Sequence, residues 1–71
     1  MSNVNWNRVR QAIKKAKGQS NINCVTVDML TSEMMDWSRG HIVAVLGELE
    51  SNGEVTLSRT ESPINTVGIL S

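Results

Sequence analysis

Phenylalanine and tyrosine are absent from this chain of 71 residues, and tryptophan occurs only twice. Because large side chains contribute most to burial, we expect Trp6 and Trp37 to be partly or wholly buried. Cysteine occurs once, at Cys24, which excludes a disulfide within the chain. We expect Cys24 to be a small buried hydrophobic residue. The N-terminal sequence MSNVNWNRVR also lacks the apolar run of a signal peptide, so we expect a cytoplasmic protein.

The chain also lacks a surplus of charge of either sign, since seven basic and seven acidic residues cancel. A neutral chain has no general attraction to the phosphates of nucleic acids, so the distribution of its charges matters more than their sum. That distribution is uneven, which predicts a molecule with a basic and an acidic part. The basic residues of the first quarter are Arg8, Arg10, Lys14, Lys15 and Lys17, and the acidic residues of the second half are Glu48, Glu50, Glu54 and Glu61.

No catalytic or metal-binding motif is visible in the sequence. The single histidine, His41, has no second histidine or paired cysteine at the spacing of metal ligands, and no glycine-rich phosphate loop is present. A chain of this length holds one domain with one thin core and little room for a substrate pocket. We therefore expect no enzymatic activity, no cofactor, no metal and no insertion into a membrane.

Hydrophobic residues repeat at helical spacing in three segments. The first helix is expected at about residues 5–17, after a cap at Asn3 or Asn5 and with Gly18 in the left-handed conformation just past its end. The second is expected at about 27–35, after an N-cap at Thr26, and the third at about 39–52, after an N-cap at Ser38. The expected core-facing stripes are Trp6, Val9, Ile13 and Ala16, then Val27, Leu30 and Met34, then Ile42, Val45, Leu46 and Leu49.

Shorter elements are predicted around these helices. A brief strand is expected at Cys24 and Val25, and Asp36 is expected to form a tight turn in the left-handed region. Alternating residues predict two further strands at about 54–58 and 66–70, joined into a hairpin by the polar residues 60–65. The methionines expected to fill the remaining core space are Met29, Met34 and Met35.

The order of these elements, and the residues from Thr26 to Leu57, resemble the winged helix-turn-helix superfamily of bacterial and archaeal regulators. In that family a capped short helix, a turn and a helix that begins with Ser-Arg precede a glycine and a β-hairpin called the wing. The sequence LGELESNGEV is similar to the family's Leu-x-x-Leu-x-x-x-Gly-x-Val passage into the wing, and the small fimbrial-operon regulators are similar in size. The resemblance implies an α+β fold with three helices and a C-terminal wing at about 54–70, in one domain of residues 1–71.

The resemblance also implies a function, because this family binds double-stranded DNA with its third helix in the major groove. It implies a small transcriptional regulator that pairs as a homodimer on adjacent half-sites. The positions that it assigns to DNA contacts are Ser38, Arg39, His41 and Val43 in the third helix and Arg59 and Thr60 in the wing, with Arg8, Lys14 and Lys15 as further phosphate contacts.

The outward face of the third helix leaves a second interpretation open. At 100° per residue, Gly40, Ala44 and Gly47 fall opposite the core-facing stripe, where helices that read DNA usually carry long polar side chains. Each interior glycine costs a helix about 1 kcal/mol relative to alanine, which suggests that something approaches this backbone closely. The alternative to a DNA-binding protein is therefore a module that binds a protein partner through these small residues.

Overall fold

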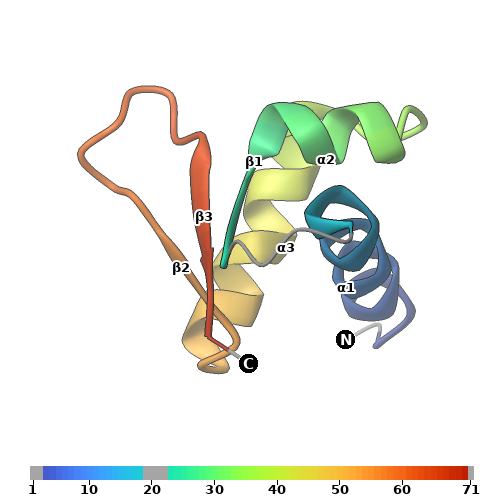
Figure 1. The fold of residues 1–71 in the computed structure, drawn as a ribbon, viewed down its shortest axis with the longest axis horizontal. Coiled ribbons are helices and arrows are strands. Elements are labelled where there is room, and N and C mark those ends of the chain that lie inside the picture. Colours follow the sequence, from blue (N-terminus) through green and yellow to red (C-terminus); the bar gives the residue numbers. More distant parts are fainter. Residues whose placement is uncertain (1–2, 19–22, 71) are drawn as a thin grey trace.

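The computed structural model describes residues 3–18 and 23–70, and within them it contains three helices and three strands (Figure 1). This is a small α+β fold, compatible with a winged-helix layout. Figure 1 shows the three helices grouped together and the last two strands beside them, with their connecting loop projecting away. In chain order the elements are α1 (Asn3–Lys17), β1 (Cys24–Thr26), α2 (Val27–Glu33), α3 (Arg39–Ser51), β2 (Val55–Leu57) and β3 (Thr66–Ile69).

Helix α1 begins earlier than predicted, at Asn3, so Asn5 lies inside the helix and does not cap it. Its end agrees with the prediction, because Gly18 has a φ of +61° and donates its backbone N–H to the carbonyl of Lys14 over 3.0 Å. The hydrophobic stripe is also confirmed. Val9 and Ile13 are buried, and Trp6 packs against the core while remaining partly exposed.

Helix α2 is capped as predicted, since the hydroxyl of Thr26 accepts a hydrogen bond of 3.1 Å from the backbone N–H of Met29. It ends at Glu33, two residues before the predicted end at 35. The reason is that Met34 leaves the helical conformation, with φ −126° and ψ 66°, and turns its side chain into the core. Met35 then points outward and is 86% exposed, so its predicted role as core filler is wrong.

Helix α3 supplies the centre of the core. The hydroxyl of Ser38 accepts a hydrogen bond of 3.1 Å from the N–H of His41, which confirms the predicted N-cap. Beyond the last turn, Gly53 has a φ of +80° that only glycine adopts without strain. The buried residues of α3 are the predicted stripe of Ile42, Val45, Leu46 and Leu49.

The sheet is antiparallel throughout and has the order β1-β3-β2, with β3 in the centre. Val67 of β3 lies opposite Val25 on one side and Leu57 on the other, and all three side chains are buried. Side chains alternate between the two faces of a strand, so the neighbouring row must point outward. Cys24, in that row opposite Gly68, is accordingly exposed, and its predicted burial is wrong.

Candidate nucleic-acid interface

The connection between α2 and α3 is a tight turn closed by a hydrogen bond of 3.0 Å from the N–H of Trp37 to the carbonyl of Met34. Among the described residues only Gly18 and Gly53 have positive φ, so the left-handed conformation predicted for Asp36 is wrong. Asp36 contributes through its side chain instead. Its two carboxylate oxygens each accept a hydrogen bond of 2.9 Å from the guanidinium of Arg8.

Trp37 connects this turn to α1 and to α3. Its ring stacks on the imidazole of His41, with centroids 4.1 Å apart and planes within 9°, and the guanidinium of Arg8 lies 5.2 Å from the centroid. The hydrogen bonds from Arg8 lower the pKa of the Asp36 carboxyl below its ordinary value. Trp37 is partly buried, as predicted, and its ring contacts both Arg8 of α1 and His41 in the first turn of α3.

The outward side of α3 carries only small side chains. We call Gly40, Ala44, Gly47 and Ser51 the open face of α3, because each is exposed or half-exposed. A Cβ atom added at Gly40 or Gly47 would meet nothing within 4 Å. Glu48 lies on the flank of this face and accepts a hydrogen bond of 2.7 Å from the indole N–H of Trp6. The half-buried Val43 packs against the core, so it presents little surface outward.

Arg39, assigned by resemblance to a DNA contact, is held within the fold. Its guanidinium donates to the carboxylate of Asp28 over 2.5 Å, to the carbonyl of Ile64 over 3.0 Å and to the side-chain oxygen of Asn65 over 3.2 Å. Its side chain is only 33% exposed. Arg39 therefore joins the first turn of α3 to the first turn of α2 and to the segment that leads into β3.

Replacing Arg39 with alanine is expected to lower the free energy of unfolding by about 1–2 kcal/mol, because three hydrogen bonds in a partly exposed site are lost. Lysine should recover less than half of this loss, because a single ammonium cannot reproduce the fork of the guanidinium. Urea unfolding of both variants measures the effect. If alanine leaves stability unchanged, the junction does not depend on Arg39.

The predicted wing residues Arg59 and Thr60 lie in the loop between β2 and β3. Arg59 forms an ion pair with Glu50 of α3, and the hydroxyl of Thr60 lies 3.4 Å from that of Ser58. Glu50 also accepts a hydrogen bond of 3.1 Å from the N–H of Leu57. This bond, followed by the one from Arg59, lowers the pKa of the Glu50 carboxyl. Arg59 is thus drawn toward α3, although its side chain is 63% exposed.

Glu61 organises the loop that leads into β3. Its carboxylate accepts hydrogen bonds from the backbone N–H of Thr66 over 2.7 Å, from that of Asn65 over 3.1 Å and from the hydroxyl of Thr66 over 2.9 Å. These bonds, the one from the Thr66 backbone foremost, lower the pKa of the Glu61 carboxyl below its ordinary 4.5. The carboxylate form therefore stabilises the loop.

This lowered pKa predicts a pH-dependent contribution from Glu61. The stabilisation is complete above the unfolded-state pKa, which is close to the ordinary 4.5, and is lost as the pH falls through the lower folded-state value. A Glu61→Gln variant should have a lower Tm than the wild type at pH 7, and the difference should close as the pH approaches 3. Circular dichroism melting curves measure this difference.

Glu33→Gln is the matched control for Glu61→Gln. The Glu33 carboxylate is exposed and accepts no hydrogen bond from the described residues. This variant should follow the wild-type Tm at every pH. A constant gap between Glu61→Gln and the wild type from pH 7 to pH 3 would contradict the role assigned to the Glu61 charge.

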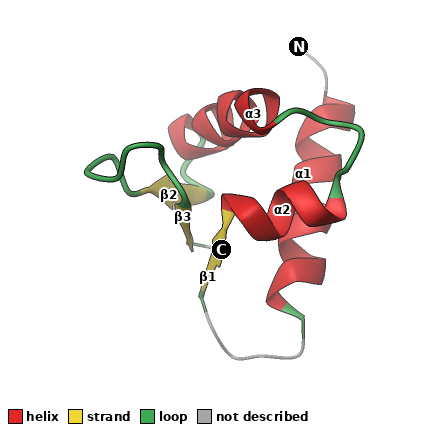
Figure 2. Cartoon of the chain, turned by 90° about the horizontal axis from the view of Figure 1, so that it is seen from above, coloured by secondary structure: helices red, strands yellow, loops and turns green. Residues whose placement is uncertain are grey.

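The remaining predicted phosphate contacts, Lys14 and Lys15, are not brought together with α3. Figure 2 shows the end of α1 that precedes residues 19–22 on the opposite side of the molecule from α3. Neither lysine forms an ion pair with a described residue. Ser38 and His41 lie instead at the start of α3, with Arg8 against the neighbouring Trp37 ring, and the loop after β2 reaches α3 through the ion pair between Arg59 and Glu50.

Three residues that the sequence interpretation did not assign to this region hold it in shape. The side-chain oxygen of Asn65 accepts a hydrogen bond of 3.2 Å from the N–H of Asp28. Its backbone carbonyl accepts one of 2.7 Å from the N–H of Val27. With Glu61 and Asp28, it fastens the hairpin loop to the start of α2. An Asp in the first turn of α2 and polar residues before a strand are common features, so nothing in the sequence marked these three as partners.

Within residues 3–18 and 23–70, no group of three or more His, Cys, Asp or Glu side chains could hold a metal ion. None of the helices in the same residues is long and apolar enough to cross a membrane. Comparisons with protein-family models, with curated proteins and with solved structures found no match to this chain.

Proposed function

We propose that this chain is a winged helix-turn-helix protein that binds double-stranded DNA as a small transcriptional regulator. In this proposal α2 and α3 form the helix-turn-helix, α3 lies in the major groove and the β2–β3 hairpin is the wing. The observation that carries it is the open face of α3, which follows a capped helix N-terminus. On one flank Arg8 lies over the Trp37 ring that stacks on His41, and on the other flank Arg59 pairs with Glu50. The region from Ser38 to Gly47 contains no carboxylate that would repel phosphate.

Small side chains on α3 favour close approach of the helix to DNA. The first N–H groups of a helix have no partner within the helix, and the Ser38 hydroxyl occupies only that of His41. The N–H groups of Arg39 and Gly40 are therefore directed to an anion or to water, and a phosphate fits there. Ser38, the N-cap of α3, and the edge of the His41 ring are the groups that we assign to base edges.

The two flanking arginines can exchange their partners at low cost. Arg8 and Asp36 have side chains that are 43% and 63% exposed, and Arg59 is 63% exposed. Ion pairs at such exposed sites contribute only about 0–1 kcal/mol to folding stability. The closely spaced phosphates of DNA attract a cation more strongly than one exposed carboxylate does. Both guanidiniums can thus leave a carboxylate for a phosphate when DNA binds.

This arrangement supplies few DNA contacts for each protomer. A single small domain with a neutral charge balance is expected to bind weakly, so we propose that two copies act as a homodimer on adjacent half-sites. Specificity then comes from the spacing of the half-sites and from groove shape as well as from base contacts.

The proposal is tested by fluorescence anisotropy with a labelled duplex at about 50 mM and about 200 mM salt. Two phosphate contacts made by cations, at Arg8 and Arg59, predict a loss of affinity of about 12-fold between the two conditions. Arg8→Gln and Arg59→Gln should each reduce the slope of log K against log salt by about 0.9. The control Lys15→Gln should leave the slope unchanged. If the wild type binds no duplex even at low salt, the proposal fails.

A second candidate function is a protein-binding module, and the same open face of α3 favours it. Each of the four arginines forms an ion pair within the described residues, so the surface offers little unbalanced positive charge near α3. Small residues let two helices pack closely. The partner would be a second copy of the chain or another protein.

A Gly47→Arg variant separates the two functions. The side chain has room in the isolated fold, because a Cβ at this position meets nothing within 4 Å. If α3 faces a DNA groove, the added arginine should maintain or increase DNA affinity. If helices pack on this face, the arginine should break the complex, which light scattering detects as a loss of molecular mass.

A further inference from the structure

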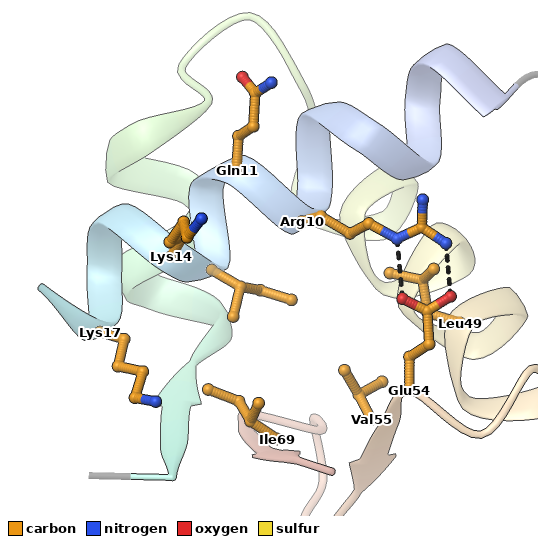
Figure 3. A pocket seen from close by; sticks show the side chains of 9 residues that line it. Arg10, Gln11, Lys14, Lys17, Leu49, Glu54, Val55 and Ile69 are labelled. Carbon is orange, nitrogen blue, oxygen red and sulfur yellow. Dashed lines mark hydrogen bonds and ion pairs between the residues drawn. The ribbon is translucent and has the colours of Figure 1, made fainter. Parts of the chain in front are cut away.

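A cavity of about 330 Å³ lies between α1 and the sheet (Figure 3). It does not involve the open face of α3, and only Leu49 of α3 reaches it. Figure 3 shows α1 along one side of the cavity, with Lys14 and Lys17 extending from it, and Val55 and Ile69 on the strands opposite. The lining residues are Arg10, Gln11, Ile13, Lys14, Lys17, Leu49, Glu54, Val55 and Ile69.

The floor of the cavity is entirely apolar. Ile13, Leu49 and Val55 belong to the buried core, and the partly buried Ile69 packs against them. No polar side chain interrupts this floor among the lining residues, since the charged ones reach the cavity from its rim. A ligand body that displaces water here must therefore be aliphatic, because a polar group would lose its hydrogen bonds to water without replacement.

The rim is positively charged. Arg10 is paired with Glu54 through two hydrogen bonds of 2.7 Å and 2.5 Å, and this pairing lowers the pKa of the Glu54 carboxyl. Lys14 and Lys17 form no ion pair with a described residue. Three cations and one carboxylate leave a net charge of two positive units around an apolar floor.

We propose that this cavity binds a small amphipathic carboxylate, with the carboxylate between Lys14 and Lys17 and an aliphatic chain over Ile13, Val55 and Ile69. The volume is at the lower end of the range of about 300–1,000 Å³ for small-molecule sites, which favours a medium-length chain. The positive rim is complementary to a carboxylate, and the apolar floor is complementary to an aliphatic chain. The inference does not depend on DNA binding.

Titration of the ¹⁵N-labelled full chain with octanoate, below its micelle concentration, tests the proposal. The amide signals of residues 10–17, 55 and 69 should shift, and those of residues 38–47 should not. Affinity should rise about three- to fourfold for each added CH₂ group from hexanoate to octanoate, because each group becomes buried. Octanol, which has the same chain without the charge, should bind at least tenfold more weakly.

Variants of the rim distinguish this site from general adsorption. The double variant Lys14→Gln/Lys17→Gln should weaken octanoate binding about tenfold, whereas Lys15→Gln, which alters a neighbouring lysine outside the cavity, should not.

Three results would overturn the proposal. The first is the absence of signal shifts at millimolar octanoate, and the second is shifts that map outside the cavity. The third is equal affinity of the wild type and the double lysine variant, since the rim charges would then play no part. Melting curves of each variant confirm that it is folded before its affinity is compared with that of the wild type.

Discussion

Replacing Leu46 with alanine is expected to lower the free energy of unfolding by about 3–4 kcal/mol. Leu46 is fully buried at the centre of α3, where its side chain joins the core shared by the helices and the sheet. The substitution removes apolar contacts and leaves a cavity that the surrounding helices cannot close. A chain of this size has a total stability of only about 4–10 kcal/mol, so much of the variant should unfold near 37 °C. Urea unfolding followed by circular dichroism measures the loss.

Leu70→Ala is the matched control, because it removes the same atoms from a side chain that is 60% exposed. Its effect on the free energy of unfolding should stay within about 0.5 kcal/mol. Equal losses at the two positions would contradict the core described above, since they would place Leu46 and Leu70 in similar surroundings.

If the chain binds DNA as we propose, the second large effect is expected at Ala44 on the open face of α3. Ala44→Glu should weaken binding to a duplex about tenfold at low salt, and Ala44→Arg should strengthen it by a similar factor. Glutamate and arginine both have high helix propensity and Ala44 is exposed, so neither variant should disturb the fold. Anisotropy titrations at matched salt compare the two variants.

Lys15→Glu controls for the change in total charge. It lowers the net charge by two units, more than Ala44→Glu does, but it lies in the last turn of α1. Figure 2 shows that end of α1 on the side of the molecule opposite α3. Screening over a Debye length of about 8–10 Å should keep its effect well below tenfold. If Lys15→Glu weakens binding more than Ala44→Glu, the duplex contacts α1 rather than α3.

Local signals in the sequence predicted most of the fold. Capping by Thr26 and Ser38, and helix termination at Gly18, depend on the chemistry of one side chain or one backbone position. Hydrophobic spacing likewise predicted the buried faces of all three helices. These features are readable because each depends on residues within one or two turns of one another.

Features that depend on pairing across the chain could not be predicted in the same way. Cys24 was expected in the core, but the register with Gly68 places it on the outer row of the sheet. Met35 was assigned to a helix that in fact ends at Glu33. Both predictions were wrong because strand register and helix ends are set by tertiary packing.

The surroundings of Arg39 in the candidate site could not be predicted from the sequence either. Resemblance assigned Arg39 to a DNA contact, and this stays a prediction; within the fold its guanidinium donates to Asp28, Ile64 and Asn65, which lie 11 to 26 residues away along the chain. The sequence reveals an arginine at a helix start but does not reveal what surrounds it. The smoothness of the open face was visible in the sequence, because it follows from helical spacing alone.

The most direct test of the DNA-binding proposal maps the contact surface on the ¹⁵N-labelled protein at about 50 mM salt. On addition of a duplex, the amide signals of residues 38–47 and of the loop at residues 58–65 should shift, while those of residues 14–18 should remain in place. Shifts confined to residues 14–18, or no shifts at all, would contradict the assignment of α3 and the β2–β3 hairpin to the DNA-binding surface.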